Sequence, residues 1–280
     1  MAGVKVVTDS GADIPKNVRE ELDIAVVPLT IHFGEEEFKD GVDLDTTEFY
    51  RRLHAGGLPR TTQPSPADFE AVYRRLQDEA DAIVSVHLSS ELSGTMQSAV
   101  LASTMDGVAV PVHVVDTRSA SLGIGLLAIE AARMARAGAA AADIVQRLEE
   151  LVARQRVLFV VDTLEFLQRN GRIGRAQAFV GGLLNIKPLL TIDDGVVAPL
   201  ERARGRAKAR ARLVELVAEG AAGQRVRVAV MHADAADEAE SLASELRARL
   251  DVEELLVGQL GPTIGTHAGP GTIGVVFHSV

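Results

Sequence analysis

Two loops in the sequence carry hydroxyl groups at places where an anionic group could bind. Thr61 and Thr62 lie too far upstream of the next predicted helix to cap it, so their hydroxyls are free for another role. Residues 89–95 (SSELSGT), which include Ser93, lie between a predicted strand and a predicted helix. Free backbone N–H groups at a helix start favour a negative charge. Capping of this helix by one of the serines is the simpler local explanation, and both interpretations stay open.

A third loop presents a single histidine. Residues 261–271 (GPTIGTHAGPG) place His267 among four glycines and two prolines, which predicts a rigid loop that a ligand can approach closely. Ser93 and His267 could alternatively be the nucleophile and base of an acyl hydrolase or acyltransferase. The Gly-x-Ser-x-Gly elbow of such enzymes is absent, because Glu91 replaces its first glycine, and no acidic partner for the histidine is identifiable.

Other chemistries are less favoured by the residue patterns. The seven histidines show no metal-ligand spacing and cysteine is absent, so we expect no metal site. Arginines concentrate at residues 169–175 and 202–212, which would suit a phosphate-bearing ligand or an acidic partner. Neither a P-loop nor a Gly-x-Gly-x-x-Gly sequence after a strand is present, so we rank sugar- or nucleotide-phosphate binding last.

The composition is typical of a globular protein and disfavours several partners. The 280-residue chain is 47% hydrophobic and carries a net charge of −10, so nucleic acid is not expected as its main partner. The first residues lack a basic region followed by an apolar run, so we expect no signal peptide, and the apolar runs are shorter than the roughly 20 residues of a membrane span. We therefore expect a cytoplasmic protein.

Predicted strands and helices indicate an α/β protein with two domains. Apolar strands at residues 4–8, 24–33, 82–88 and 112–115 alternate with helices, which predicts a doubly wound, mostly parallel sheet. The second half combines βα units with a hairpin across Asp193-Asp194-Gly195, which predicts a mixed α+β domain, with a further helix over residues 176–184. We place the domain boundary so that the domains are residues 1–155 and 156–280.

Six short motifs, taken together and in this order, resemble those of the DegV family of bacterial fatty-acid-binding proteins. The resemblance spans nearly the whole chain. The matching pieces are VTDSGADIP at the start, TTQPSP at residues 61–66, SSELSGTMQSA at 89–99, VVDTRSASLGIG at 114–125, FLQRNGRIG at 166–174 and IGTHAGPGTIGV near the end.

This resemblance implies that a long-chain fatty acid is enclosed between the two domains and is presented to a fatty acid kinase. The kinase subunit would supply the ATP chemistry and phosphorylate the bound carboxylate, and the acyl phosphate would enter phospholipid synthesis. For this chain itself, the resemblance implies no catalytic residue, no cofactor and no stable membrane insertion.

The resemblance also implies roles for individual residues. It assigns the carboxylate to Thr61, Ser93 and His267. Their neighbours, which we add to the expected site, are Thr62, Gly94 and Thr95.

Two arginines are expected to face the kinase. The resemblance places Arg172 near the partner-facing surface, and the second arginine-rich stretch adds Arg202 to this docking surface. The alkyl chain needs an apolar slot, which we expect between the domains. The candidate tunnel residues are Leu164, Phe166, Leu167, Phe179, Leu183, Leu184 and Ile186.

Overall fold

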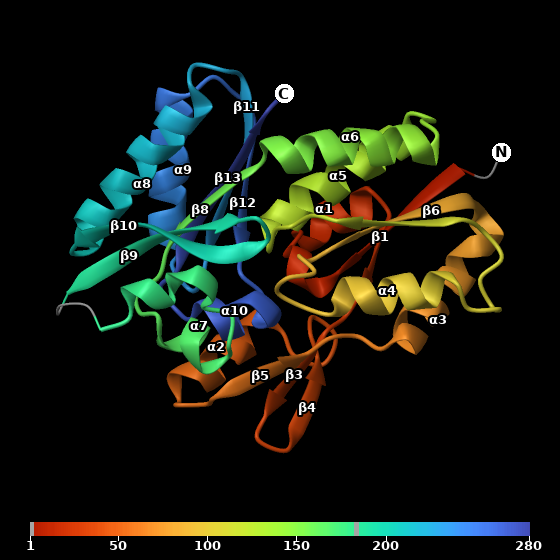
Figure 1. Ribbon diagram of the computed structural model, residues 1–280, viewed down its shortest axis with the longest axis horizontal. Helices are drawn as coiled ribbons and strands as arrows, with labels where there is room; N and C mark the ends of the chain where they lie inside the picture. The colour runs from red at the N-terminus through yellow and green to blue at the C-terminus, as the bar shows by residue number, and fades with distance from the viewer. Residues whose placement is uncertain (1–2, 182–184) are drawn as a thin grey trace.

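Two large β-sheets lie side by side in the computed structural model, which describes residues 3–181 and 185–280 (Figure 1). The strands of the first sheet are β1 (Gly3–Asp9), β2 (Ile24–Val27), β6 (Ala80–His87) and β7 (Val112–Asp116). They pair in the order β2-β1-β6-β7 and are all parallel. Helices bury both faces of these strands, as their nearly continuous apolar sequences predict. The predicted doubly wound parallel sheet is confirmed.

Four helices form the two layers that cover this sheet. Helices α3 (Pro66–Leu76) and α4 (Thr95–Ser103) pack on one face, and α5 (Leu122–Arg136) and α6 (Ala141–Arg154) pack on the other (Figure 1). Helix α3 begins with a capping box, in which Ser65 and Asp68 exchange hydrogen bonds. Two shorter helices precede these in the chain: α1 (Lys16–Glu21) and α2 (Thr46–His54).

Helix α5 connects the two sheets physically. Its Ile124 and Leu127 are buried in the core of the first sheet, whereas Leu122 and Leu126 are buried in a second cluster with Met231 of the other sheet. A helix that is packed on two sides needs apolar residues around most of its circumference, which explains its Leu-, Ile- and Ala-rich sequence.

The second sheet has six strands of mixed direction. They are β8 (Arg156–Val160), β9 (Ile186–Asp193), β10 (Val196–Arg204), β11 (Val226–His232), β12 (Val252–Gln259) and β13 (Ile273–Ser279). Their order is β10-β9-β8-β13-β11-β12, and of these pairs only β11 and β12 run parallel. The predicted hairpin is present: Asp194 and Gly195 both have positive φ, as a two-residue turn of this kind requires. Helices α8 (Arg206–Ala221) and α9 (Ala236–Arg249) cover the outer face.

A small third sheet corrects the prediction of one strand over residues 24–33. The strand is interrupted at Pro28, which has no backbone N–H to donate to a neighbouring strand. Strand β2 therefore ends at Val27, and a new strand starts at Thr30. This strand, β3 (Thr30–Phe33), pairs antiparallel with β4 (Glu36–Lys39) and β5 (Pro59–Thr62). Thr61 therefore lies on a strand rather than in a loop.

The prediction of a loop at residues 261–271 is wrong as well. Residues Pro262–Ala268 form helix α10, which has Pro262 at its first position and ends at Gly269 with φ of 76°. Proline and glycine here begin and end a helix, and His267 lies in its last turn. The helix predicted over residues 176–184 is replaced by a short 3-10 helix, η3 (Gly174–Phe179), which follows α7 (Glu165–Arg169), and residues 182–184 lie outside the described part.

The two large sheets come from consecutive parts of the chain. The first sheet and its helices end with α6 at Arg154, and the second sheet starts with β8 at Arg156. The division into domains 1–155 and 156–280 stays a prediction. Within residues 3–181 and 185–280, no helix is both long and apolar enough to cross a bilayer.

Candidate functional site

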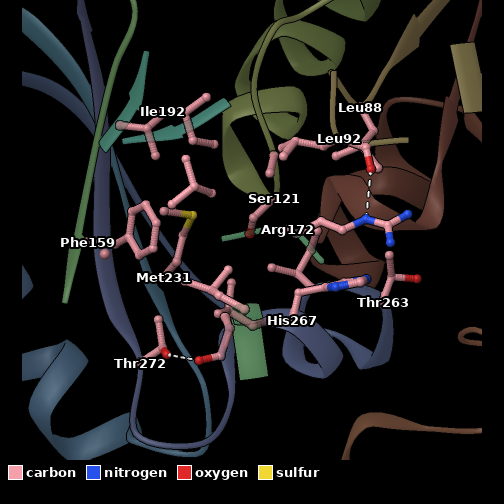
Figure 2. Close-up of a pocket in the computed structure, with 18 of the residues that line it drawn as sticks. Leu88, Leu92, Ser121, Phe159, Arg172, Ile192, Met231, Thr263, His267 and Thr272 are labelled. Carbon is pink, nitrogen blue, oxygen red and sulfur yellow. Dashed lines mark hydrogen bonds between the residues drawn. The ribbon is translucent and has the colours of Figure 1, made fainter. Parts of the chain in front are cut away.

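An apolar cavity lies where the two halves of the chain meet. The space between its walls is about 800 Å³, part of it open to solvent. Both halves contribute to the wall, and α10 forms one side of it (Figure 2). The apolar wall includes Leu88, Leu92, Val157, Phe159, Ile192, Val197, Met231 and Leu260.

Thr61, Ser93, Arg172 and His267 are among the polar residues that line this cavity, together with Ser121, Thr263 and Thr272. The Oγ1 atom of Thr61 lies 2.9 Å from Nε2 of His267, across 206 residues of sequence. Figure 2 shows Arg172 and His267 together on one side of the cavity, with Ile192 and Phe159 on the opposite side. Folding therefore brings together all three residues predicted to hold a carboxylate, and it adds a cation to them.

His267 is electrically neutral at pH 7 in this environment. Burial, and to a lesser extent the positive charge of Arg172, lower its pKa to about 4. Its Nδ1 atom is buried and has no hydrogen-bond partner among the described residues. If Nε2 carries the ring hydrogen, Thr61 keeps its hydroxyl hydrogen. If Thr61 donates to Nε2, Nδ1 keeps a hydrogen. In either tautomer the pair retains one hydrogen for a further acceptor.

Arg172 is held by backbone groups and keeps its charge uncompensated. Its Nε donates to the carbonyl of Leu92 at 3.1 Å, and its Nη1 donates to the carbonyl of Asn170 at 2.8 Å. Its neighbours Arg169 and Arg175 pair with carboxylates, but Arg172 forms no such ion pair within the described residues. A positioned guanidinium without a counter-charge suits an anionic ligand group.

The structure separates the two arginines that we assigned to a docking surface. Arg172 lies on the cavity wall. Arg202 is exposed on β10, where its guanidinium lies 4.3 Å from the ring centre of Phe179 and donates to the carbonyl of Ala178 at 3.1 Å. Of these two arginines, therefore, only Arg202 has the exposed position expected of a residue that contacts a partner protein and not the ligand.

The neighbours of the carboxylate candidates have supporting positions. The Thr62 hydroxyl lies 2.8 Å from Nε2 of His32, on the opposite face of β5 from Thr61, because side chains alternate along a strand. Thr95 is fully buried, and its hydroxyl lies 2.9 Å from that of Ser93, so it holds Ser93 in place. A Cβ atom at Gly94 would meet the exposed side chain of Gln63, which would have to move aside.

Most of the predicted tunnel residues lie elsewhere. Of the predicted tunnel residues that the structure describes, only Leu167 lines the cavity. Phe166 packs against Gly269 behind α10, and Leu183 and Leu184 lie outside the described residues. A separate, more open hollow is lined by Leu164, Phe179 and Ile186. Proximity to the domain boundary does not specify which face a side chain lines. Within the second half of the chain, much of the apolar wall comes instead from strands β8, β9, β10 and β11.

A buried hydrogen-bonded chain supports the loop that carries Ser93. Tyr73, Ser85, His87 and Asp9 are linked in series by contacts of 2.8, 2.6 and 2.9 Å. The Asp9 carboxylate also accepts the amide hydrogen of Leu88 at 3.0 Å, where the loop begins. Our sequence interpretation missed this network. The signal was two polar residues, Ser85 and His87, at alternate positions in the buried half of strand β6.

The geometry gives no support to an acyl hydrolase. The side chain of His267 contacts Thr61, while that of Ser93 contacts Thr95. No carboxylate of the described residues bonds to Nδ1 of His267, so a nucleophile–base–acid series is not assembled there. The Ser85–His87–Asp9 series has such an order, but all three residues are fully buried and no substrate reaches them. In the described part of the chain, no cluster of three metal-ligating side chains occurs.

Comparison with known proteins establishes the family. The model of the DegV family matches residues 3–280. The chain belongs to the DegV family. It is 42% identical over 278 residues to a DegV domain-containing protein of Streptomyces coelicolor, with 99% of this chain and 98% of the relative covered. A protein of Thermotoga maritima that is described as a fatty acid-binding protein is 37% identical, with 97% and 96% covered.

Solved DegV structures share the whole fold. A DegV family protein from Thermus thermophilus, described by its fatty acid binding, matches with a TM-score of 0.93 and 41% identity over 99% of this chain and 100% of that one. DegV from Bacillus subtilis, described as a fatty acid binding protein, matches with a TM-score of 0.90 and 39% identity over 100% of both chains. The family and the mixed α/β fold predicted from the motifs are thus confirmed.

Proposed function

We propose that this DegV family protein binds one long-chain fatty acid in the apolar cavity, between domains 1–155 and 156–280. The carboxylate lies at Thr61, Ser93, Arg172 and His267, and the alkyl chain extends toward Phe159 and Ile192. The observation that carries the proposal is an apolar cavity with these four polar side chains among its lining residues. DegV proteins that are described as fatty-acid-binding share this fold, which supports a fatty acid as the ligand class.

The alkyl chain and the carboxylate of the fatty acid contribute to the binding free energy in different ways. Each buried CH₂ contributes about 0.8 kcal/mol, so a chain of more than a dozen carbons provides much of the affinity. A buried carboxylate is costly unless donors satisfy it. Here two hydroxyls, one imidazole and the Arg172 guanidinium are available as donors.

The protein presents this carboxylate to a fatty acid kinase subunit in the cytoplasm. A surface hollow adjoins the cavity and shares Ser93 and Arg172 with it, which gives a phosphoryl donor a route to the head group. On the partner, a carboxylate oxygen bonds to the γ-phosphorus of ATP as the bond to the β-phosphate oxygen breaks. ADP leaves, and the acyl phosphate enters phospholipid synthesis. Arg202 belongs to the docking surface.

Native mass spectrometry of the purified protein tests the binding function. The expected spectrum contains a complex heavier than the apoprotein by the mass of a C14–C18 fatty acid. A phosphorylated metabolite in its place, or failure to bind added palmitate, contradicts the proposal.

A reconstituted assay with the kinase subunit and ATP tests presentation. The Arg202→Glu variant should lose phosphorylation while its affinity for palmitate stays unchanged, because a docking charge acts on the encounter of the proteins. Equal loss of both properties would contradict the docking role.

A further inference from the structure

Helix α10 makes two polar contacts, one helical turn apart, with the small sheet β4-β3-β5 and the residue that follows β4. At its last turn, His267 contacts Thr61 on β5 at 2.9 Å. At its first turn, the hydroxyl and the backbone amide of Thr263 both donate to one oxygen of Asp40, the amide at 3.2 Å. Asp40 directly follows β4, and β4 and β5 pair with opposite sides of β3.

The two attachments share one face of the helix. Thr263 and His267 are four residues apart, so they lie one above the other, separated by about 6 Å of helix rise. Both line the cavity. The middle of this turn is wedged against α2, because a Cβ atom at Gly265 would lie only 2.8 Å from ring atoms of Phe49 and from the Tyr50 hydroxyl. A shift of the first turn would therefore tilt the helix about Gly265 and displace His267.

The surroundings of Asp40 disfavour its charged form. The residue is 5% exposed, and burial raises the pKa of its carboxyl to about 6. Within the described part of the chain no lysine, arginine or histidine pairs with it, so its charge is balanced only by N–H and O–H donors. Asp13 lies close by and similarly accepts the amide hydrogen of Gly261, at 2.9 Å. Asp40 is buried and Asp13 is partly buried, and neither has a cationic partner among the described residues. Two such acids at one helix start are a costly way to obtain stability alone.

We infer that Asp40 is a positioning residue for the head-group site: by holding Thr263 it fixes α10 so that His267 meets Thr61. The inference rests on the proposed function for its effect on ligands, but the placement of His267 is a property of the ligand-free protein. Asp40 touches neither the imidazole nor the expected carboxylate position, and it acts through one turn of helix.

The first test compares binding of palmitate with binding of methyl palmitate. Asp40→Ala should weaken palmitate binding about tenfold and leave methyl palmitate within about twofold, since only the free acid depends on the polar end. Asp40→Asn keeps an oxygen acceptor for Thr263, so it should restore palmitate binding nearly to that of the wild type. Equal losses for both ligands, no loss, or failure of asparagine to rescue would each overturn the inference.

A matched control and a second variant guard against general destabilisation. Asp68→Ala removes a carboxylate from the start of α3, away from α10, and should lower the melting temperature without changing the ratio of the two affinities. If Asp40→Ala does not fold, Thr263→Val removes the same side-chain hydrogen bond and leaves the carboxylate in place. It should weaken palmitate binding severalfold and spare the ester, and equal effects on both ligands would again contradict the inference.

A ligand-free measurement separates this inference from the proposed function. In the wild type, NMR titration of the His267 ring should have a midpoint near pH 4. In the Asp40→Ala variant the displaced ring gains water, and the midpoint should rise by about one pH unit or more. An unchanged midpoint overturns the positioning role even if palmitate binds. A raised midpoint supports the role even if no fatty acid binds, in which case only the proposed function fails.

Discussion

The two ends of the cavity are held in place by different forces. At the polar end, individual hydrogen bonds fix each side chain: Thr61 to His267, Ser93 to Thr95, and Arg172 to two backbone carbonyls. At the opposite end, Val157, Phe159, Ile192 and Met231 come from three strands of the second sheet and are fixed by packing. The polar end is specified by a few atoms, the apolar end by the shape of a sheet.

This difference predicts different kinds of selectivity at the two ends. Substitutions at the polar end should change the affinity for a free acid and spare its methyl ester, because the ester presents no anionic oxygens. Substitutions at the apolar end should change both affinities equally, because the alkyl chains are identical. The ratio of the two affinities therefore reports which end a residue serves.

The largest effect is expected from charge reversal of Arg172. Arg172→Glu places an uncompensated negative charge beside the ligand carboxylate, at a cost of about 3–5 kcal/mol, so palmitate should bind at least 100-fold more weakly. Methyl palmitate should be affected far less. Calorimetric titration of both ligands measures the two losses.

Arg169→Glu is the matched control for charge. Arg169 lies three residues earlier on the surface and pairs with Glu165, so its reversal should leave both affinities unchanged. If the two reversals weaken palmitate binding equally, Arg172 acts through the long-range field and not at the cavity wall.

Removal of His267 should change the dependence of stability on pH. Its folded pKa of about 4 is below its ordinary value of 6.5, so the unfolded chain takes up a proton first as the pH falls. The stability associated with the neutral ring is complete above pH 6.5 and is lost as the pH falls toward 4, at up to about 1.4 kcal/mol per pH unit.

The His267→Gln variant lacks this loss. Urea unfolding at pH 7 and pH 4 should show its stability relative to the wild type improving by up to about 3 kcal/mol at the lower pH. Asp40 is present in both proteins, so its own titration cancels in the difference. A pH-independent difference would mean that the ring is not buried in its neutral form.

Loss of one hydroxyl should have a smaller effect on binding. Thr61→Val and Ser93→Ala each remove a hydrogen bond to a charged group, about 1.5–3 kcal/mol, so palmitate should bind about 10–100-fold more weakly. The double variant should lose less than the sum, because both donors serve one carboxylate. Thr62→Val is the control one residue away, on the opposite face of β5, and should have no effect on either ligand.

The smallest effect is expected at the apolar end. Ile192→Ala removes chain contacts and should weaken palmitate and methyl palmitate equally, by about tenfold at most. Leu164→Ala, in the separate hollow, should leave both unchanged. A selective effect of Ile192→Ala on the free acid would reverse our assignment of the two ends.

The same difference explains how much of the site the sequence could predict. The polar residues lie in short motifs that resemble those of the DegV family, so the sequence could predict that Thr61, Ser93 and His267 share one site although three distant segments carry them. Their role in holding a carboxylate stays a prediction. The apolar wall has no motif, because Phe159, Ile192 and Met231 belong to strands that read only as buried, and their common face depends on how the sheet packs against α5. The prediction of tunnel residues near the domain boundary therefore found only Leu167.

Parts of the fold could not be predicted from the sequence either, because they too depend on tertiary contacts. The parallel sheet followed from alternating apolar runs and helices, and the hairpin followed from Asp194-Gly195. The small sheet that holds α10 was not predicted, because β4 and β5 are polar four-residue strands without an alternating apolar pattern. Their pairing with β3 is a tertiary feature, and so is the contact of Asp40 with Thr263.

A crystal structure with 16-bromopalmitic acid tests the central claim most directly, because anomalous scattering locates the bromine at the end of the chain. The account predicts a bromine peak beside Ile192, Phe159 and Met231, with the carboxylate within hydrogen-bond distance of Thr61 and Ser93. A bromine peak beside His267, or in the hollow formed by Leu164, Phe179 and Ile186, would contradict it.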